Sequence, residues 1–231
     1  MQKRLLVGAI LFIGLGGLAA VKMTKSKLTE VTTITNALDN ANTKASKPLT
    51  LETSFEFPTP KPLPAFELID QHGRPFTNAN LLNTWSLFFV GYTACPDVCP
   101  TTMSKLSAAY PSLKQNGPLQ VIFLSVDPAR DTPEKLLSYT EFFNPEFIAL
   151  TSKNGNHATL MPLTRSLGIV YSMVGEGDDY QVDHSSSLVL VSPAGERVAV
   201  IKPTISAGKI PQIRNQALIA DMQQLMQQNR R

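Results

Sequence analysis

Apolar and polar positions divide the chain into three parts. Residues 5–21 form an apolar run without charges, LLVGAILFIGLGGLAAV, after a short basic start. Residues 22–60 are rich in Thr, Asn, Lys and Ser, and offer too little apolar surface to offset the entropy of ordering. After residue 60, apolar residues recur in short runs and at helical spacing. The pattern predicts a membrane segment over 1–21, a flexible tether over 22–60, and one folded domain over 61–231 that begins near Pro64.

Two continuous apolar runs predict the centre of that domain. Trp85–Val90 and Leu119–Val126 have the length and composition of buried strands. Helical spacing predicts a helix from about Pro100 and another over Pro133–Phe143. The remaining expected elements are a hairpin from Phe66 turning at His72-Gly73, a strand at Phe147–Leu150, a helix over His157–Leu167, an antiparallel pair at Val170–Val174 and Tyr180–Val182, a hairpin of Ser187–Val191 with Arg197–Ile201, and a helix over Pro211–Gln228. This order predicts an α/β domain of thioredoxin-like fold, with a mixed central sheet and flanking helices.

The apolar run at residues 5–21 has two interpretations. Its 17 residues are at the short limit for crossing a hydrocarbon layer of ~30 Å and slightly long for a signal-peptide core. We expect an uncleaved signal anchor; the alternative is a secretory signal cleaved after Ala19 or Ala20. A lipoprotein is not expected, because no cysteine precedes Cys95. Lysines flank the run on both sides, so charge alone leaves its orientation open.

Charge and cysteine content exclude several classes of protein. The chain has 231 residues, 21 Lys plus Arg against 18 Asp plus Glu, and a net charge of +3. The excess lies before residue 61, which leaves the predicted domain neutral and gives no support to a nucleic-acid-binding face. Two cysteines allow one disulfide at most, which excludes a disulfide-rich scaffold.

Both cysteines occur in Cys95-Pro-Asp-Val-Cys99, between a predicted buried strand and a predicted helix. A helix N-terminus favours the thiolate, and thiols four residues apart at a helix start face the same side. Two close thiolates suit Cu(I). A redox-active dithiol is a serious alternative. A purely structural disulfide is less favoured, because closing so short a loop gains little entropy.

His184 is the third candidate ligand. It follows Asp183 just before a predicted strand, and imidazole binds both Cu(I) and Cu(II). Sequence spacing does not show that it meets cysteines 85 to 89 residues away, and a lone histidine at such a junction is more often a surface residue. His72 and His157 lie in polar segments and are expected to be solvated.

A charged loop, Asp127 to Thr132, follows the second buried strand at the sheet edge that also carries Cys95. Sites in open α/β sheets lie at this edge, so Asp127, Arg130 and Asp131 are candidates for a role there. The alternative is a turn in which Asp131 or Thr132 caps the next helix. Asp97, between the cysteines, either tunes them or faces solvent. The scattered methionines are expected to fill the core.

Three segments together resemble the Sco/SenC family of copper-binding, thioredoxin-like proteins that assemble cytochrome c oxidase. They are GYTACPDVCPTTM at 91–103, LSVDPARDTP at 124–133 and DYQVDHSSSLVLVSPAGE at 179–196. The resemblance covers roughly residues 60–205. It implies that Cys95, Cys99 and His184 bind one copper ion, and that an N-terminal helix anchors the domain on the periplasmic side of a bacterial inner membrane.

The resemblance also implies a role. The chain is expected to deliver copper to the CuA centre of oxidase subunit II. The alternative is a thiol–disulfide reductase in which Cys95 and Cys99 are catalytic and reduce the cysteines of that subunit or other periplasmic thiols. A peroxidase-like activity is the weakest hypothesis, because it needs a single low-pKa cysteine.

Overall fold

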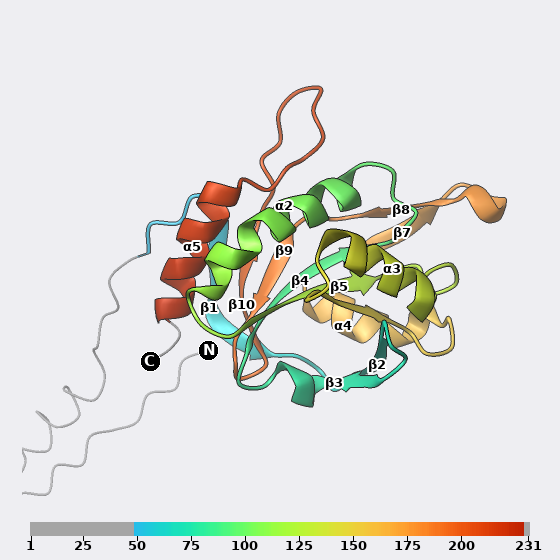
Figure 1. The fold of residues 1–231 in the computed structure, drawn as a ribbon, viewed down its shortest axis with the longest axis horizontal. Coiled ribbons are helices and arrows are strands. Elements are labelled where there is room, and N and C mark those ends of the chain that lie inside the picture. The colour runs from blue at the N-terminus through green and yellow to red at the C-terminus, as the bar shows by residue number, and fades with distance from the viewer. Residues whose placement is uncertain (1–48, 229–231) are drawn as a thin grey trace, which may run out of the picture. The chain divides into compact units, whose positions relative to one another are not determined.

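The computed structural model describes residues 49–228, which contain one eight-stranded mixed sheet with helices packed on it (Figure 1). The strands run in the order β1-β10-β9-β4-β5-β6-β2-β3, and β7 pairs only with β8 in a separate two-stranded sheet. Their bounds are β1 Ser54–Pro62, β2 Glu67–Asp70, β3 Pro75–Thr77, β4 Trp85–Gly91, β5 Leu119–Ser125, β6 Ile148–Thr151, β7 Tyr171–Val174, β8 Gln181–His184, β9 Leu188–Val191 and β10 Glu196–Ile201. The helices are α2 Val98–Lys114, α3 Pro133–Phe143, α4 Met161–Ser166 and α5 Asn215–Gln228.

The two apolar runs form the centre of the sheet, as predicted. Every residue of β4 is buried, and β4 pairs in parallel with β5, from Trp85 opposite Leu119 to Gly91 opposite Ser125. β5 is parallel to β6, whereas β9 and β10 are antiparallel. The mixed α/β fold expected from the sequence is therefore confirmed.

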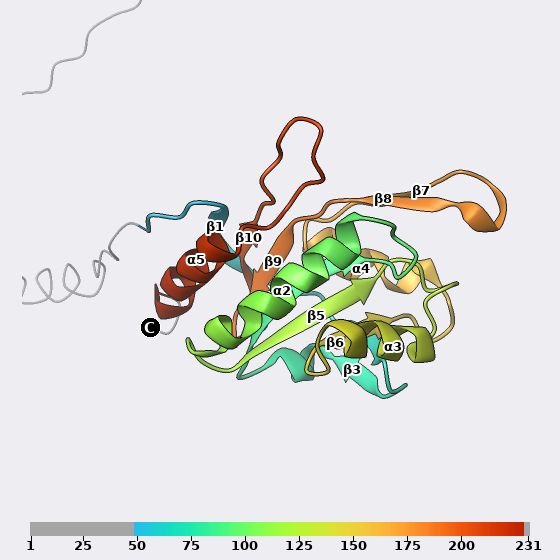
Figure 2. The ribbon, with the colours of Figure 1, turned by 45° about the horizontal axis from the view of Figure 1, so that its top comes forward.

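Successive residues of β4 face two different cores. Leu87 and Phe89 belong to the core under α2 and α5, whereas Phe88 and Val90 belong to the core that includes Leu163 of α4. Because side chains alternate across a strand, an unbroken apolar run serves a sheet that is covered on both faces. Figure 2 shows α2 crossing one face and α4 lying on the other.

The first strand begins earlier than the sequence predicted. β1 pairs antiparallel with β10 from Ser54 opposite Ile201, so the folded domain does not begin near Pro64. Prolines are tolerated because β1 is an edge strand, whose outer side needs no hydrogen-bond donors. Buried Asp221 of α5 fixes the start of this strand by accepting hydrogen bonds from the backbone N–H groups of residues 52, 53 and 54, at 2.8–2.9 Å.

Two predicted helices have different bounds. The segment 157–167 divides into a 3₁₀ turn at His157–Thr159 and a helix that starts at Met161, because Pro162 suits only a first turn. The last helix begins at Asn215 rather than Pro211; residues 203–214 instead form a loop closed by a bridge between Thr204 and Gln212.

Within residues 49–228, no helix is long and apolar enough to cross a bilayer. The predicted membrane segment at 1–21, and the predicted tether up to residue 48, lie outside the described residues.

Candidate metal centre

The cysteine pair lies at the connection between β4 and α2. The loop after Gly91 turns back through a hydrogen bond from the Cys95 N–H to the Tyr92 carbonyl, and α2 starts at Val98. Cys99 thus sits in the first helical turn, fully buried, while Cys95 just before the helix is half-buried. The Cys99 N–H points at the Cys95 sulfur, with a nitrogen–sulfur distance of 3.5 Å. Both thiols are free, which rules out the disulfide staple in this structure.

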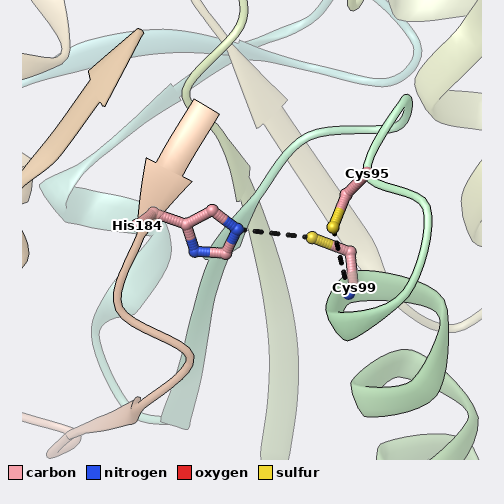
Figure 3. A group of neighbouring side chains, drawn as sticks. All are labelled: Cys95, Cys99 and His184. Carbon is pink, nitrogen blue, oxygen red and sulfur yellow. Dashed lines mark hydrogen bonds between the residues drawn. The ribbon is translucent and has the colours of Figure 1, made fainter. Parts of the chain in front are cut away.

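His184 comes to the same place from the end of β8. Its Nε2 lies 3.5 Å from the Cys99 Sγ, and Figure 3 shows the ring pointing at the two sulfur atoms. The Nδ1 lies 3.0 Å from the Ser185 carbonyl oxygen. A carbonyl can only accept, so Nδ1 donates to it, and Nε2 is the ring nitrogen that faces the thiols and is available to a metal. All three candidate ligand atoms lie within 4.8 Å of one another, and together they could hold a metal ion.

The two thiols are electrostatically unequal. The hydrogen bond from the Cys99 thiol lowers the pKa of Cys95 well below its ordinary value, against the effect of burial, and His184 adds to this. The same hydrogen bond, together with burial and the nearby Cys95 charge, raises the pKa of Cys99. The metal-free site therefore holds one thiolate, on Cys95 near the surface, and one thiol beneath it.

Gly91 makes room for the buried thiol, a role that the sequence analysis missed. A Cβ atom at this position would lie 2.7 Å from the Cys99 Sγ and 2.8 Å from the Phe123 ring. The rings of Phe89 and Tyr92 meet the His184 ring edge-on, at 6.4 and 6.1 Å between centroids. The site therefore has apolar walls that fix the imidazole and the inner thiol.

Asp131 holds the cysteine loop from below. Its buried carboxylate accepts hydrogen bonds from the Thr93 N–H at 3.0 Å, the Thr93 hydroxyl at 2.6 Å and the Ser125 hydroxyl at 2.6 Å. Burial raises the pKa of Asp131, and these hydrogen bonds oppose the rise. Thr132, not Asp131, caps α3. The charged loop thus has both predicted functions, divided between two residues.

A second network fixes the strand that carries His184. The Tyr180 hydroxyl donates to buried Asp127 at 2.5 Å, and the Arg130 guanidinium both pairs with Asp127 and lies 3.7 Å from the Tyr180 ring centroid. The Tyr92 hydroxyl donates to the Gln181 side chain at 2.7 Å. The β7–β8 pair is separate from the main sheet, and these contacts connect the start of β8 to the loops after β4 and β5. The sequence analysis named Asp127 and Arg130 as candidates for a role at this edge of the sheet, but it did not identify their partner Tyr180.

The other candidates lie outside this group. His72 is exposed in the β2–β3 turn, as expected. His157 is half-buried beside Tyr171, with a buried Nδ1 that has no hydrogen-bond partner in the described part of the chain, so it is only partly solvated. Asp97 is exposed and its side chain makes no cap hydrogen bond, which agrees with the solvent-facing alternative. Met103, Met222 and Met226 are fully buried core residues as expected, whereas Met161 and Met173 are exposed, so the expectation fails for those two.

A mixed α/β domain with two thiols and an imidazole at the carboxyl end of its central strand defines a soft-metal-binding class of protein. The SCO1/SenC family model matches residues 58–218, and the chain belongs to this family. It is 40% identical over 150 residues to an SCO2-like protein of Rickettsia typhi, covering 63% of this chain and 72% of that protein.

Two solved structures with copper bound have the same fold. ScoI of Arabidopsis thaliana matches with a TM-score of 0.61 and 30% identity over 71% of this chain and 98% of that chain. ScoI of Bradyrhizobium japonicum matches with a TM-score of 0.58 and 29% identity over 71% of this chain and 99% of that chain.

Proposed function

We propose that this chain is a copper metallochaperone that binds one copper ion through Cys95, Cys99 and His184. The observation that carries the proposal is the convergence of three donor atoms within 4.8 Å, from segments 85 residues apart. Two thiolates and an imidazole suit Cu(I), and the imidazole also suits Cu(II). The copper-bound structures of two relatives support the choice of metal.

The difference between the two thiols suits a protein that transfers its copper to a partner. Cys99, buried and protonated without metal, would lose its proton when copper binds, and the Nε2 of His184 already faces the two thiols. Cys95 is the half-buried ligand, so a partner thiolate can approach on its side. The transfer would be a ligand exchange: donor atoms of the partner bond to copper as the bonds to Cys95, Cys99 and His184 break. Cys99 then regains a proton from solvent, and the copper keeps its oxidation state.

We further propose that the recipient is subunit II of cytochrome c oxidase, at its CuA centre. In this proposal the domain is of thioredoxin-like type, is tethered by the apolar run at residues 5–21, and lies on the periplasmic side of a bacterial inner membrane. Family membership supports the recipient, and the length and charge-free composition of the run support the tether.

A thiol–disulfide reductase is the second candidate, favoured by the two free thiols and the lowered pKa of Cys95. In that reaction the Cys95 thiolate would attack a partner disulfide. Cys99 would then resolve the mixed disulfide, transferring two electrons to the partner. The imidazole 3.5 Å from the Cys99 sulfur has no necessary part in disulfide reduction. The presence of His184 therefore favours copper binding over the reductase function.

Copper stoichiometry and absorption spectra of the purified full-length chain test the proposal. Cu(I) and Cu(II) are loaded separately onto the reduced chain and onto Cys95→Ser, Cys99→Ser and His184→Ala variants, with exposed His72→Ala as the matched control. We expect one copper per chain and a thiolate-to-Cu(II) charge-transfer band that each site variant loses and His72→Ala keeps. His184→Ala should retain Cu(I). Unchanged copper binding in a variant that combines Cys95→Ser with Cys99→Ser would refute the site. No stable copper, with a readily cycling disulfide, would favour the reductase.

A further inference from the structure

The loop at residues 202–214, between β10 and α5, projects from the domain and is not part of the metal centre. The backbones of Thr204 and Gln212 hydrogen-bond to each other at 2.8 and 3.1 Å and close the base of the loop. The Lys209 N–H donates to the Ser206 carbonyl, and Gly208 takes a φ of +69° at the turn. In Figures 1 and 2 the loop rises beside α2 and α5, whereas the β7–β8 pair extends in a different direction.

The loop exposes apolar side chains beside a cationic pocket. Ile205 is 77% exposed and Ile210 is 37% exposed, although neither is needed to close the base. Between the loop and α2 lies a pocket of about 310 Å³, lined by Lys105, Lys209 and Arg214 together with Ile210, Ile213 and hydroxyl and amide side chains. Arg214 pairs with Glu52, but Lys105 and Lys209 have no ion-pair partner in the part of the chain that the structure describes. Exposed apolar side chains beside lysines are typical of a segment that lies in a membrane interface.

The charges of the C-terminal half are segregated along the sequence. Residues 197–220 contain Arg197, Lys202, Lys209 and Arg214 and no Asp or Glu. Residues 166–196, which include the β7–β8 pair, contain five acids and no Lys or Arg. Three of these cations, Lys202, Lys209 and Arg214, belong to the loop, whereas Arg197 lies in β10. In a domain that is neutral overall, this segregation would attract the loop to an anionic surface and repel the β7–β8 pair from it.

We propose that the 202–214 loop binds a bilayer surface that contains anionic lipids. Ile205 and Ile210 enter the interfacial region, and Lys105 and Lys209 contact headgroup phosphates. The charge complementarity and the exposed isoleucines favour lipid over a protein partner. The loop would then orient the domain on the membrane, independently of copper binding.

Tryptophan fluorescence of the full-length chain in proteoliposomes tests this inference. Ile205→Trp places a fluorophore at the most exposed apolar position of the loop, while the native Trp85 is 2% exposed and contributes a constant background. The vesicles contain equal amounts of phosphatidylglycerol and phosphatidylcholine with brominated acyl chains, or brominated phosphatidylcholine alone. Met173→Trp, at a residue 42% exposed on β7, is the matched control for a tryptophan outside the loop. Only chains that float with the vesicles are measured.

We expect the tryptophan at position 205 to be quenched and blue-shifted in the anionic vesicles, and much less in phosphatidylcholine or at high salt. Adding Lys105→Gln and Lys209→Gln should lower the equilibrium constant for contact roughly 25-fold, about fivefold for each lysine. Equal quenching at positions 173 and 205, no quenching at 205, a response independent of lipid charge, or failure to float with anionic vesicles would each overturn the proposal. Copper binding should be unchanged in all these variants. A failure of the membrane proposal would therefore leave the proposed copper site untouched.

Discussion

Replacing Gly91 with alanine should dislodge the Cys99 thiol. The new Cβ would lie 2.7 Å from the Cys99 sulfur, and ordinary van der Waals contact begins at 3.4 Å, so one of the two atoms must move by about 0.7 Å. The Phe123 ring, 2.8 Å from the same Cβ, blocks escape on its side. Metal–ligand distances tolerate only about 0.2 Å, so the site cannot absorb this shift.

Two magnitudes follow for Gly91→Ala. Overpacking a fully buried position costs about 1–3 kcal/mol of unfolding free energy. Displacing one thiolate ligand should weaken Cu(I) binding about 10- to 100-fold, the usual cost of losing the groups that orient a ligand. The backbone of Gly91 does not have a positive φ, so the alanine tests space alone.

Urea unfolding of the metal-free chain measures the first effect, and competition with a Cu(I) chelator measures the second. A Cys99→Ala background supplies the control, because it removes the sulfur that the new methyl group meets. In that background Gly91→Ala should cost less by about 1 kcal/mol, the coupling expected of two residues in contact. A coupling of zero, or an unchanged Cu(I) affinity in the single variant, would refute the argument that Gly91 makes room for the thiol.

Three further substitutions test the groups around the site and the first strand. Asp131→Asn weakens the acceptor for Thr93, so unfolding free energy measured in urea should fall by about 1–3 kcal/mol and Cu(I) affinity about tenfold. Tyr180→Phe removes the hydroxyl that donates to buried Asp127, so the Cu(II) absorption band should weaken while Cu(I) binding holds, as titrations would show. Burial raises the pKa of Asp221, but the hydrogen bonds that its carboxylate accepts from backbone N–H groups outweigh burial and lower the pKa. The stability that Asp221 contributes is therefore present above the ordinary Asp pKa of about 4 and is lost as pH falls through the lowered value; unfolding of Asp221→Asn should lack this loss.

Each of these substitutions has a matched control. Asp179→Asn changes an exposed carboxylate outside both networks, and should leave stability and copper binding unchanged. Tyr171→Phe alters a half-buried tyrosine whose hydroxyl has no hydrogen bond within residues 49–228. An equal effect of Tyr171→Phe and Tyr180→Phe on the Cu(II) band would contradict the proposed role of the Asp127 contact. An acid transition that is identical in the Asp221→Asn variant would contradict the pH argument.

The sequence by itself determined the centre of the fold. Continuous apolar runs at Trp85–Val90 and Leu119–Val126 have one favourable outcome, a strand buried on both faces, and both became central strands. The order of elements then limited the sheet to parallel pairing followed by antiparallel pairing. Local spacing also brought the two cysteines together, because residues four apart at a helix start face the same side.

Element ends and the first strand depended on tertiary contacts. β1 is polar and contains prolines, so its local pattern resembles a tether; it is held by pairing with β10 and by the Asp221 carboxylate, which lies 167 residues away from Ser54. The start of α5 moved from Pro211 to Asn215 because the 203–214 segment closes on itself as a loop. No local preference encodes such distant partners.

The family resemblance indicated His184 as the third ligand, but its distance from the cysteines and the contacts that support it were decided by the tertiary structure. Local sequence gives His184 the features of a surface residue, and only the return of β8 beneath the cysteine loop brings its Nε2 to 3.5 Å from Cys99. The sequence pattern did not indicate the roles of Gly91 and Tyr180. Gly91 leaves space for the Cys99 thiol, and Tyr180 supplies a hydroxyl to the buried Asp127 carboxylate. Sequence patterns record the burial and spacing of neighbouring residues, whereas the distance between remote side chains is fixed only when the whole chain has packed.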